Sequence, residues 1–221
     1  METAGVKWER LSGDYGIYVS KSHGFTSDTI ALAEFSRPKK GERCADFGTG
    51  AGGIPILWQI GGEPGLCDAV ELQQEAAGQA EASVERNGLE DRIRVYHRDI
   101  RDFREFMSHQ CYDRISCNPP YKAKGAGVLN PDAARRAARH EESMSAEDIL
   151  AAARFSLKFG GGLFICQRPE RLTDFMLLFR EYGIEPKRLR FVQHNAAGQP
   201  SLFLLEGRRG GRPGLRAIEN E

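Results

Sequence analysis

The sequence lacks the cysteine spacing that metal sites and disulfide frameworks require. Its five cysteines are Cys44, Cys67, Cys111, Cys117 and Cys166, and no two of them form a Cys-x-x-Cys pair. Four of them fall within short apolar runs, where a cysteine usually serves as a small buried hydrophobic side chain. We therefore expect neither a metal site nor a disulfide framework.

Long apolar segments are also missing. Nowhere do about 18 apolar residues follow one another, the length that a membrane-spanning helix needs. The first six residues, Met-Glu-Thr-Ala-Gly-Val, carry an acidic side chain where a signal peptide carries a basic one. These absences predict a cytoplasmic protein without a membrane partner.

The third absence is that of a net charge. The 31 basic side chains equal the 31 acidic ones, so the overall charge gives no long-range attraction to phosphate. A nucleic-acid surface would have to come from local clusters of Lys and Arg. The 40% hydrophobic and 28% charged residues exclude a disordered chain, and 221 residues usually form one α/β domain.

Short apolar runs of strand length alternate with segments of helical periodicity. The expected strands are 43–47, 66–72, 93–97, 112–117 and 161–167. Helices are expected at 73–87, from Ser145 through Leu157 to a stop at Gly160, and at 174–182. This alternation predicts parallel strands joined by crossover helices. With an antiparallel pair at 187–194 and 201–206, it indicates a Rossmann-like, doubly wound α/β sheet of seven strands.

The two ends of the chain differ from this pattern. A small hairpin is expected at 8–11 and 15–19, followed by a helix at about 27–35 that Pro38 ends. Residues 210–221 are rich in Gly and Pro and predict a poorly ordered tail. We therefore divide the chain into a cap at 1–40, a main domain at 41–209 and a flexible tail at 210–221.

A glycine-rich loop follows the first strand of the main domain. Asp46 precedes the pattern Gly48-x-Gly50-x-x-Gly53, after which a helix begins. Glycines allow the backbone to turn sharply and to approach a ligand closely, and a helix N-terminus offers free N–H groups. The pattern also fits a dinucleotide site, and a tight turn without any ligand has the same glycines.

Acidic residues at the ends of the next two strands narrow this choice. Glu71 ends the second strand and Asp99 the third, so with Asp46 three acids line consecutive carboxyl edges of the sheet. At these positions the chain resembles the class I S-adenosylmethionine-dependent methyltransferases. The resemblance implies that the loop surrounds the methionine part of the cofactor, that Glu71 and the adjacent Leu72 meet the ribose, and that Asp99 and Ile100 meet the adenine. Singly, each acid could equally be a helix cap or a surface charge.

The motif Asn118-Pro119-Pro120-Tyr121 follows the fourth strand, across the sheet from the glycine loop. An exocyclic amine shares its lone pair with its ring, so it is a poor nucleophile until its hydrogens are held out of conjugation. The Asn118 amide oxygen and the Pro119 carbonyl can each accept one N–H, and Asn118 would also border the cofactor. Proline fixes φ and directs its carbonyl rigidly. The motif therefore predicts methyl transfer to a planar amine, without a catalytic His or a metal.

Residues after the prolines suggest an RNA substrate. The Tyr121 ring offers a stacking surface worth about 1–3 kcal/mol per base, and a target adenine would have to turn outward from its strand. A basic loop follows, whose candidate phosphate ligands are Lys122, Lys124, Arg135, Arg136 and Arg139. The same charges would also suit a solvated helix face with i, i+4 pairs. Further basic residues occur at 187–190 and 208–212.

From about Tyr15 to Leu215 the chain is similar to the bacterial tRNA adenine N(6)-methyltransferases that act on the anticodon loop of a valine tRNA. Besides the motifs above, the similarity depends on segments 24–29, 138–141, 168–172 and 185–192. It implies that Phe25 and Asp28 belong to a lid that closes over S-adenosylmethionine. One departure is Cys117, because Asp or Ser is more usual before the asparagine.

Three alternatives share parts of this pattern. Protein glutamine methyltransferases use the same Asn-Pro-Pro-aromatic motif, but they have a sizeable helical domain before the glycine loop, where this chain has 44 residues. Guanine 2-amino methyltransferases of ribosomal RNA usually carry Phe or Trp in place of Tyr121. The third alternative is a catalytically silent RNA-binding scaffold, although such relatives lose chemistry residues first. We expect an adenine N(6)-methyltransferase.

Overall fold

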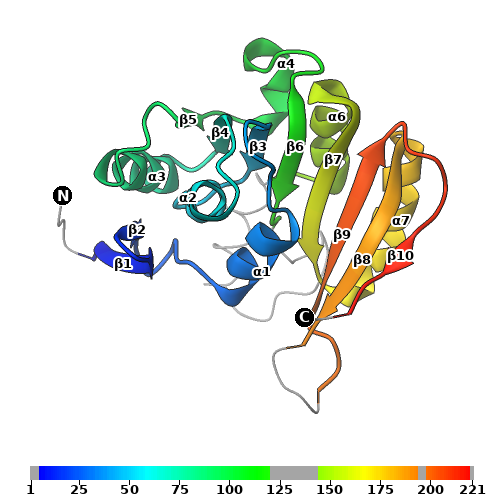
Figure 1. The fold of residues 1–221 in the computed structure, drawn as a ribbon, viewed down its shortest axis with the longest axis horizontal. Helices are drawn as coiled ribbons and strands as arrows, with labels where there is room; N and C mark the ends of the chain where they lie inside the picture. Colours follow the sequence, from blue (N-terminus) through cyan, green and yellow to red (C-terminus); the bar gives the residue numbers. More distant parts are fainter. Residues whose placement is uncertain (1–4, 120–143, 194–197, 220–221) are drawn as a thin grey trace, which may run out of the picture.

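The computed structural model describes residues 5–119, 144–193 and 198–219, and a mixed sheet of eight strands lies at its centre (Figure 1). The strand order is β10-β8-β9-β7-β6-β3-β4-β5. The strands are β3 (Arg43–Phe47), β4 (Leu66–Glu71), β5 (Ile93–His97), β6 (Tyr112–Cys117), β7 (Leu157–Gln167), β8 (Ile184–Val192), β9 (Leu202–Arg209) and β10 (Arg216–Ala217).

Helices cover both faces of this sheet (Figure 1). One face packs against α1 (Ser27–Phe35), α2 (Gly53–Gly61) and α3 (Gln74–Arg86), through a core that includes Leu32, Trp58 and Val84. The other face packs against α4 (Phe103–Phe106), α6 (Ala146–Ser156) and α7 (Leu172–Glu181). Two short 3₁₀ turns, η1 (Ile100–Asp102) and η2 (Pro169–Arg171), precede α4 and α7. The doubly wound α/β fold is thus confirmed.

Strand directions follow the expected pattern. Strands β5, β4, β3, β6 and β7 run parallel, whereas β9 is antiparallel to both β7 and β8. Strands β3, β4 and β6 in the middle of the sheet are mostly buried, whereas the edge strand β5 is partly exposed. Burial on both faces favours apolar residues in the central strands. Their carboxyl ends place Phe47, Glu71 and Cys117 at one edge of the sheet. Ligands of open α/β sheets bind at this edge.

Two predictions about the C-terminal part need correction. The sheet has an eighth strand, because β10 pairs in parallel with β8 and the Ile218 N–H donates to the Leu189 carbonyl at 2.9 Å. The segment predicted as a poorly ordered tail therefore contributes to the sheet. The helix predicted to carry Leu157 ends at Ser156, and Leu157 begins β7. The predicted helix start is confirmed, since Ser145 and Asp148 form a capping box.

The N-terminal hairpin forms a separate two-stranded sheet, β1 (Lys7–Ser12) and β2 (Tyr15–Val19). It packs beside α3 (Figure 1). The Asn87 side chain exchanges two hydrogen bonds with the backbone of Gly16, at 2.8 and 3.1 Å. The Tyr18 N–H donates to the buried Ser83 hydroxyl at 2.9 Å. These bonds hold the hairpin against α3, whereas the predicted domain boundaries at residues 40 and 209 stay a prediction.

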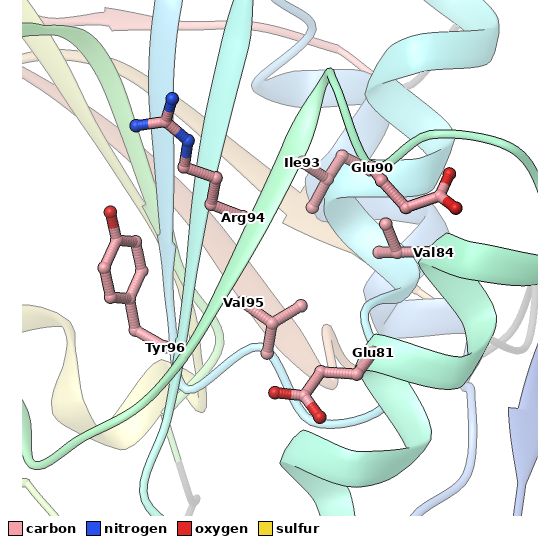
Figure 2. A pocket seen from close by; sticks show the side chains of 7 residues that line it. All are labelled: Glu81, Val84, Glu90, Ile93, Arg94, Val95 and Tyr96. Carbon is pink, nitrogen blue, oxygen red and sulfur yellow. The ribbon is translucent and has the colours of Figure 1, made fainter.

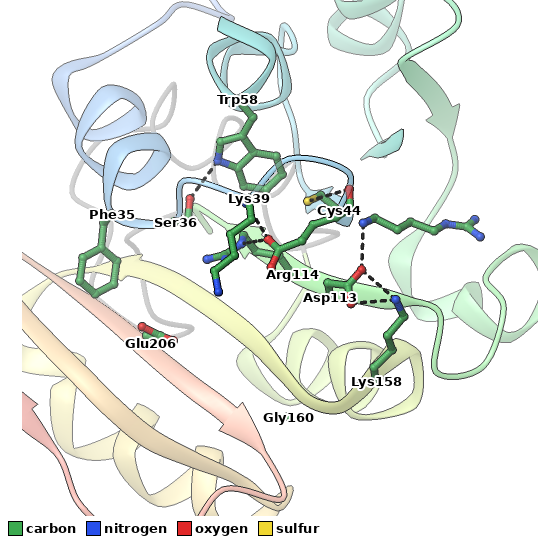
Figure 3. A network of polar contacts seen from close by, with 12 residues as sticks. Phe35, Ser36, Lys39, Cys44, Trp58, Asp113, Arg114, Lys158, Gly160 and Glu206 are labelled. Carbon is green, nitrogen blue, oxygen red and sulfur yellow. Dashed lines mark hydrogen bonds and ion pairs between the residues drawn. The ribbon is translucent and has the colours of Figure 1, made fainter. Parts of the chain in front are cut away.

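A polar network fastens the connection between α1 and β3 to the strands beneath it (Figure 3). The Trp58 indole donates to Ser36 at 3.2 Å, and the Arg114 guanidinium pairs with Glu42 at 3.0 Å. Lys158 bridges to Asp113 at 2.7 Å. Arg114 is only 5% exposed, so its charge needs the Glu42 partner to offset the cost of burial. The network lies at the amino-terminal ends of β3 and β6, away from the ligand-binding edge.

Candidate functional site

The glycine loop connects β3 to α2 in a left-handed backbone. Gly48, Gly50 and Gly52 have φ angles of +70°, +57° and +86°, a region that side chains with a Cβ atom rarely adopt. The N–H groups of Gly48 and Thr49 both donate to the Val70 carbonyl, at 2.8 and 3.0 Å. A methyl group on Gly48 would come within 2.6 Å of the Met144 side chain. The loop therefore needs glycine for its turn, whereas the Met144 contact involves only the flexible end of a side chain.

Glu71 ties the end of β4 to this loop. One carboxylate oxygen accepts the Gly50 N–H at 2.8 Å, and the other accepts the Gln73 N–H at 2.9 Å. The residue is 6% exposed, and these two donors hold its carboxylate at the sheet edge. Each carboxylate oxygen has a second lone pair, so the arrangement leaves acceptor capacity for a further hydroxyl or N–H group.

Asp46 is the most strongly perturbed acid of the site. It is 1% exposed, and burial raises its pKa to about 7, although hydrogen bonding from Ser116 and the nearby Thr49 hydroxyl offsets part of this effect. Neither Asp46 Oδ2 nor Thr49 Oγ1 has a hydrogen-bond partner of good geometry among the described residues. A buried oxygen of this kind costs free energy until a donor meets it. Asp46 is therefore suited to a cationic or N–H-bearing ligand.

Asp99 is held by its neighbour two residues along the chain. Its carboxylate accepts the Arg101 N–H at 2.9 Å and pairs with the Arg101 guanidinium, which lowers the pKa of Asp99. The side chain thus caps η1, as one of the two sequence interpretations had it. Ile100 is buried, and the Leu72 carbonyl contacts the His97 ring at 3.0 Å. A role of Asp99 in adenine binding stays a prediction.

A cleft of about 310 Å³ brings the predicted motifs together. It joins the glycine loop to Asn118 and Pro119, which follow β6, and its other wall comes from the start of α1 and the segment before it. Seven predicted site residues line it: Phe25, Asp28, Asp46, Gly48, Gly50, Asn118 and Pro119. Glu71, Leu72, Asp99 and Ile100 lie outside this lining, at and just beyond the ends of β4 and β5.

Sequence reasoning missed several wall residues of the cleft. Ile17 of the hairpin and Thr29 of α1 line it, together with Ala51 and Ile54 of the glycine segment. Nothing local in the sequence marks Ile17, because only tertiary packing brings it to the loop, whereas Thr29 ends the segment 24–29 that contributes to the family resemblance. Cys117, the departure from the family pattern, is fully buried in the core beneath the cleft. Pro120, Tyr121, Lys122, Lys124, Arg135, Arg136 and Arg139 lie outside the described residues.

A second cavity, of about 390 Å³, lies between α3 and the edge strand β5 (Figure 2). Its walls include Val84, Val95 and Tyr96, and none of the predicted site residues lines it. The cleft at the glycine loop is the better candidate site, because it combines left-handed glycines, a buried acid with one unpaired oxygen among the described residues, and the Asn-Pro motif.

In the described part of the chain, no group of three or more His, Cys, Asp or Glu side chains could hold a metal ion. No helix in that part has the length and apolar character needed to cross a bilayer.

Sequence relatives carry a consistent name. A protein of Tolumonas auensis called tRNA1(Val) (adenine(37)-N6)-methyltransferase is 38% identical over 180 residues, which cover 81% of this chain and 73% of the relative. A protein of Dyadobacter fermentans with the same name is 29% identical over 200 residues and covers 81% of each chain.

Solved structures share the fold. A predicted O-methyltransferase of Agrobacterium tumefaciens superposes with a TM-score of 0.67 at 19% identity, over 87% of this chain and 85% of that one. TrmN from Thermus thermophilus superposes with a TM-score of 0.56 at 23% identity, over 81% of this chain and 48% of that one. The family model described as methyltransferase small domain matches residues 13–180. The chain therefore belongs to the methyltransferase small domain family and is an S-adenosylmethionine-dependent methyltransferase.

Proposed function

We propose that this enzyme transfers a methyl group to the 6-amino group of adenine in tRNA, at the anticodon loop. The observation that carries the proposal is the shared cleft, in which Asn118 and Pro119 line the same space as the glycine loop. The names of the relatives from Tolumonas auensis and Dyadobacter fermentans support the choice of base, atom and RNA. A tRNA substrate also agrees with the cytoplasmic location expected from the sequence.

The residues of the cleft fit S-adenosylmethionine, whose sulfonium supplies an electrophilic methyl group. Three left-handed glycines leave room for close approach of a ligand. Asp46 Oδ2, which has no partner among the described residues, would accept a hydrogen bond from the amino group of the methionine part. Glu71 would accept the ribose hydroxyls beside Leu72, and Asp99 with Ile100 would meet the adenine. Phe25 and Asp28, which precede and begin α1, would cover the cofactor.

Asn118 and Pro119 would prepare the attacking amine. Each offers one carbonyl oxygen, and together these accept the two N–H groups of the 6-amino nitrogen. The nitrogen then becomes pyramidal and its lone pair turns from the ring toward the methyl group. Alignment of the amine with the methyl group that S-adenosylmethionine supplies would account for the rate gain, and the amine would release its proton to solvent. Neither residue changes its own protonation state in this scheme.

The remaining predicted substrate contacts involve residues 120–143. Tyr121 would stack on the flipped adenine, after Pro120 has set the chain direction. The basic residues Lys122, Lys124, Arg135, Arg136 and Arg139 would contact phosphates. These roles stay predictions that follow from the sequence.

The test is methyl transfer from labelled S-adenosylmethionine to unmodified tRNA by the wild type and by Asn118→Ala. We expect the variant to lose about 100-fold or more in single-turnover rate, because one of two preorganised acceptors is gone. Its cofactor affinity, measured by calorimetry, should stay within a few-fold. A near-normal rate would contradict the two-acceptor mechanism. A wild type that binds no S-adenosylmethionine at millimolar concentration would favour the scaffold alternative instead.

A further inference from the structure

Strands β8, β9 and β10 have one face, opposite to α7, that no helix of the described residues covers (Figure 1). Four arginines lie on this side, and we call them the arginine face: Arg188, Arg190, Arg208 and Arg216. The register fixes this placement. Arg188 stands opposite Arg216 of β10 and Glu206 of β9 in the strand register, and Arg190 stands opposite Leu204 of β9. Leu204 belongs to the core beneath α1, so its cross-strand partner points to the same side of the sheet.

Two of the four arginines share one carboxylate. Glu206 is 2% exposed, and its carboxylate accepts hydrogen bonds from both Arg188 and Arg208. Arg208 also donates to the Gly160 carbonyl at 3.1 Å, and Arg188 donates to the Phe35 carbonyl at 3.2 Å. Figure 3 shows Glu206 and Phe35 close to each other beside α1. This buried carboxylate therefore fixes the positions of Arg188 and Arg208 but leaves Arg190 and Arg216 uncompensated.

Arg190 and Arg216 have no acidic partner among the described residues. The Arg190 guanidinium lies 5.4 Å from the centre of the Phe35 ring, which holds it in place. Its Nε atom is buried and has no hydrogen-bond partner in the described part of the chain. Arg216 is exposed on β10. Two carboxylates lie among these four guanidinium groups: Glu206, and Glu185, which stands opposite Arg208 and pairs with Arg180 at 3.5 Å. The described residues of this face therefore carry an excess of positive charge on a chain whose net charge is zero.

The arginine face is continuous with the cleft through α1. Thr26, Asp28 and Thr29 at the start of α1 line the cleft, and Phe35 at its end contacts Arg188 and Arg190. A helix of nine residues is roughly 13 Å long. This length corresponds to about four nucleotides at the rise of roughly 3.4 Å per nucleotide in a helical strand. A strand whose base enters the cleft can therefore reach the arginine face.

We infer that Arg190 and Arg216 bind backbone phosphates of the substrate RNA a few nucleotides from the methylated base. The guanidinium fork matches the geometry of phosphate oxygens, and contacts of this type position the RNA without reading its sequence. The inference rests on the proposed function. An acidic protein partner could also bind these charges, but it would not need a path along α1 to the cleft. Continuity with the cleft therefore favours RNA.

The test compares tRNA binding by the double variant Arg190→Gln/Arg216→Gln with that of the wild type at several salt concentrations. The control is Arg94→Gln on β5, which also removes positive charge but lies at the opposite edge of the sheet (Figure 2). We expect the double variant to bind tRNA roughly tenfold more weakly at low salt. Its slope of log affinity against log salt should fall by about 1.4–1.8, since each of the two phosphate contacts contributes about 0.7–0.9. Cofactor affinity and the rate at saturating tRNA should not change.

If Arg190→Gln disturbs folding because the contact with Phe35 is lost, the single variant Arg216→Gln keeps the test valid, since Arg216 is exposed. The single variant Arg190→Lys keeps the charge, so its salt slope should lie closer to the wild-type value than that of Arg190→Gln. A double variant that binds tRNA like the wild type would overturn the inference, and so would a weaker affinity with an unchanged salt slope. A wild type that neither binds nor methylates tRNA would instead overturn the proposed function.

Discussion

Asp46→Asn should stabilise the ligand-free protein above pH 7 and leave its stability nearly unchanged near pH 4. The wild-type carboxyl is buried, with one oxygen bonded to Ser116 and the other without a donor among the described residues. Ionisation in this place is costly, which is why its pKa rises from 3.8 to about 7. Asparagine has almost the same shape, still accepts from Ser116 and carries no charge.

The magnitude follows from the difference between the two pKa values. Below pH 4 the carboxyl is protonated in both the folded and unfolded chains, so it contributes its full stability there. Between pH 4 and 7 the unfolded chain releases the proton first, and the free energy of unfolding falls as pH rises. Each pKa unit corresponds to about 1.36 kcal/mol, so the total loss is about 4 kcal/mol and is complete above pH 7.

Urea unfolding of wild type and variant at pH 4, 5.5 and 8, followed by Trp fluorescence, measures this difference. Other ionisable groups titrate in both proteins and cancel in the comparison. A stability difference that stays constant between pH 4 and 8, or a variant that is less stable at pH 8, would refute the reasoning. In calorimetry the variant should also bind S-adenosylmethionine more weakly, most clearly above pH 7, if Asp46 meets the cofactor's amino group.

Two further changes test the supports of the cleft. Glu71→Gln should weaken cofactor binding by about tenfold or more in calorimetry, because a neutral amide accepts hydrogen bonds from hydroxyl groups less strongly than a carboxylate does. The single-turnover rate at saturating cofactor should change little. A larger loss in rate than in affinity would contradict this role. Asn87→Ala should lower the free energy of unfolding by about 1–3 kcal/mol, since it removes both bonds to Gly16, and limited proteolysis should then cut the hairpin first; an unchanged digestion pattern would count against its role.

The strands of the parallel core could be predicted closely from the sequence. The predicted ranges 43–47, 93–97 and 112–117 agree with β3, β5 and β6. These strands are apolar runs that end at glycines or polar turns, and their local pattern agrees with their burial. The same reasoning placed the glycine loop opposite Asn118, because both follow neighbouring parallel strands.

Boundaries that depend on tertiary contacts could not be predicted in this way. Leu157 suits a helix or a strand equally well, and it begins β7 because it pairs with Tyr112 of β6 and is buried directly after α6. Strand β9 extends to Arg209 through polar residues, since Glu206 finds partners on the neighbouring strand and Gly207 leaves room for the Phe179 ring. The pairing of Asp99 with Arg101 likewise depends on the turn that η1 makes.

Mass spectrometry of nucleosides from bulk tRNA tests the central claim most directly, in cells with the gene, without it, and complemented by the wild type or by Asn118→Ala. The account predicts that N(6)-methyladenosine falls when the gene is lost, returns with the wild type and stays low with the variant. Loss of N(2)-methylguanosine instead, an unchanged set of nucleosides, or full restoration by Asn118→Ala would contradict it.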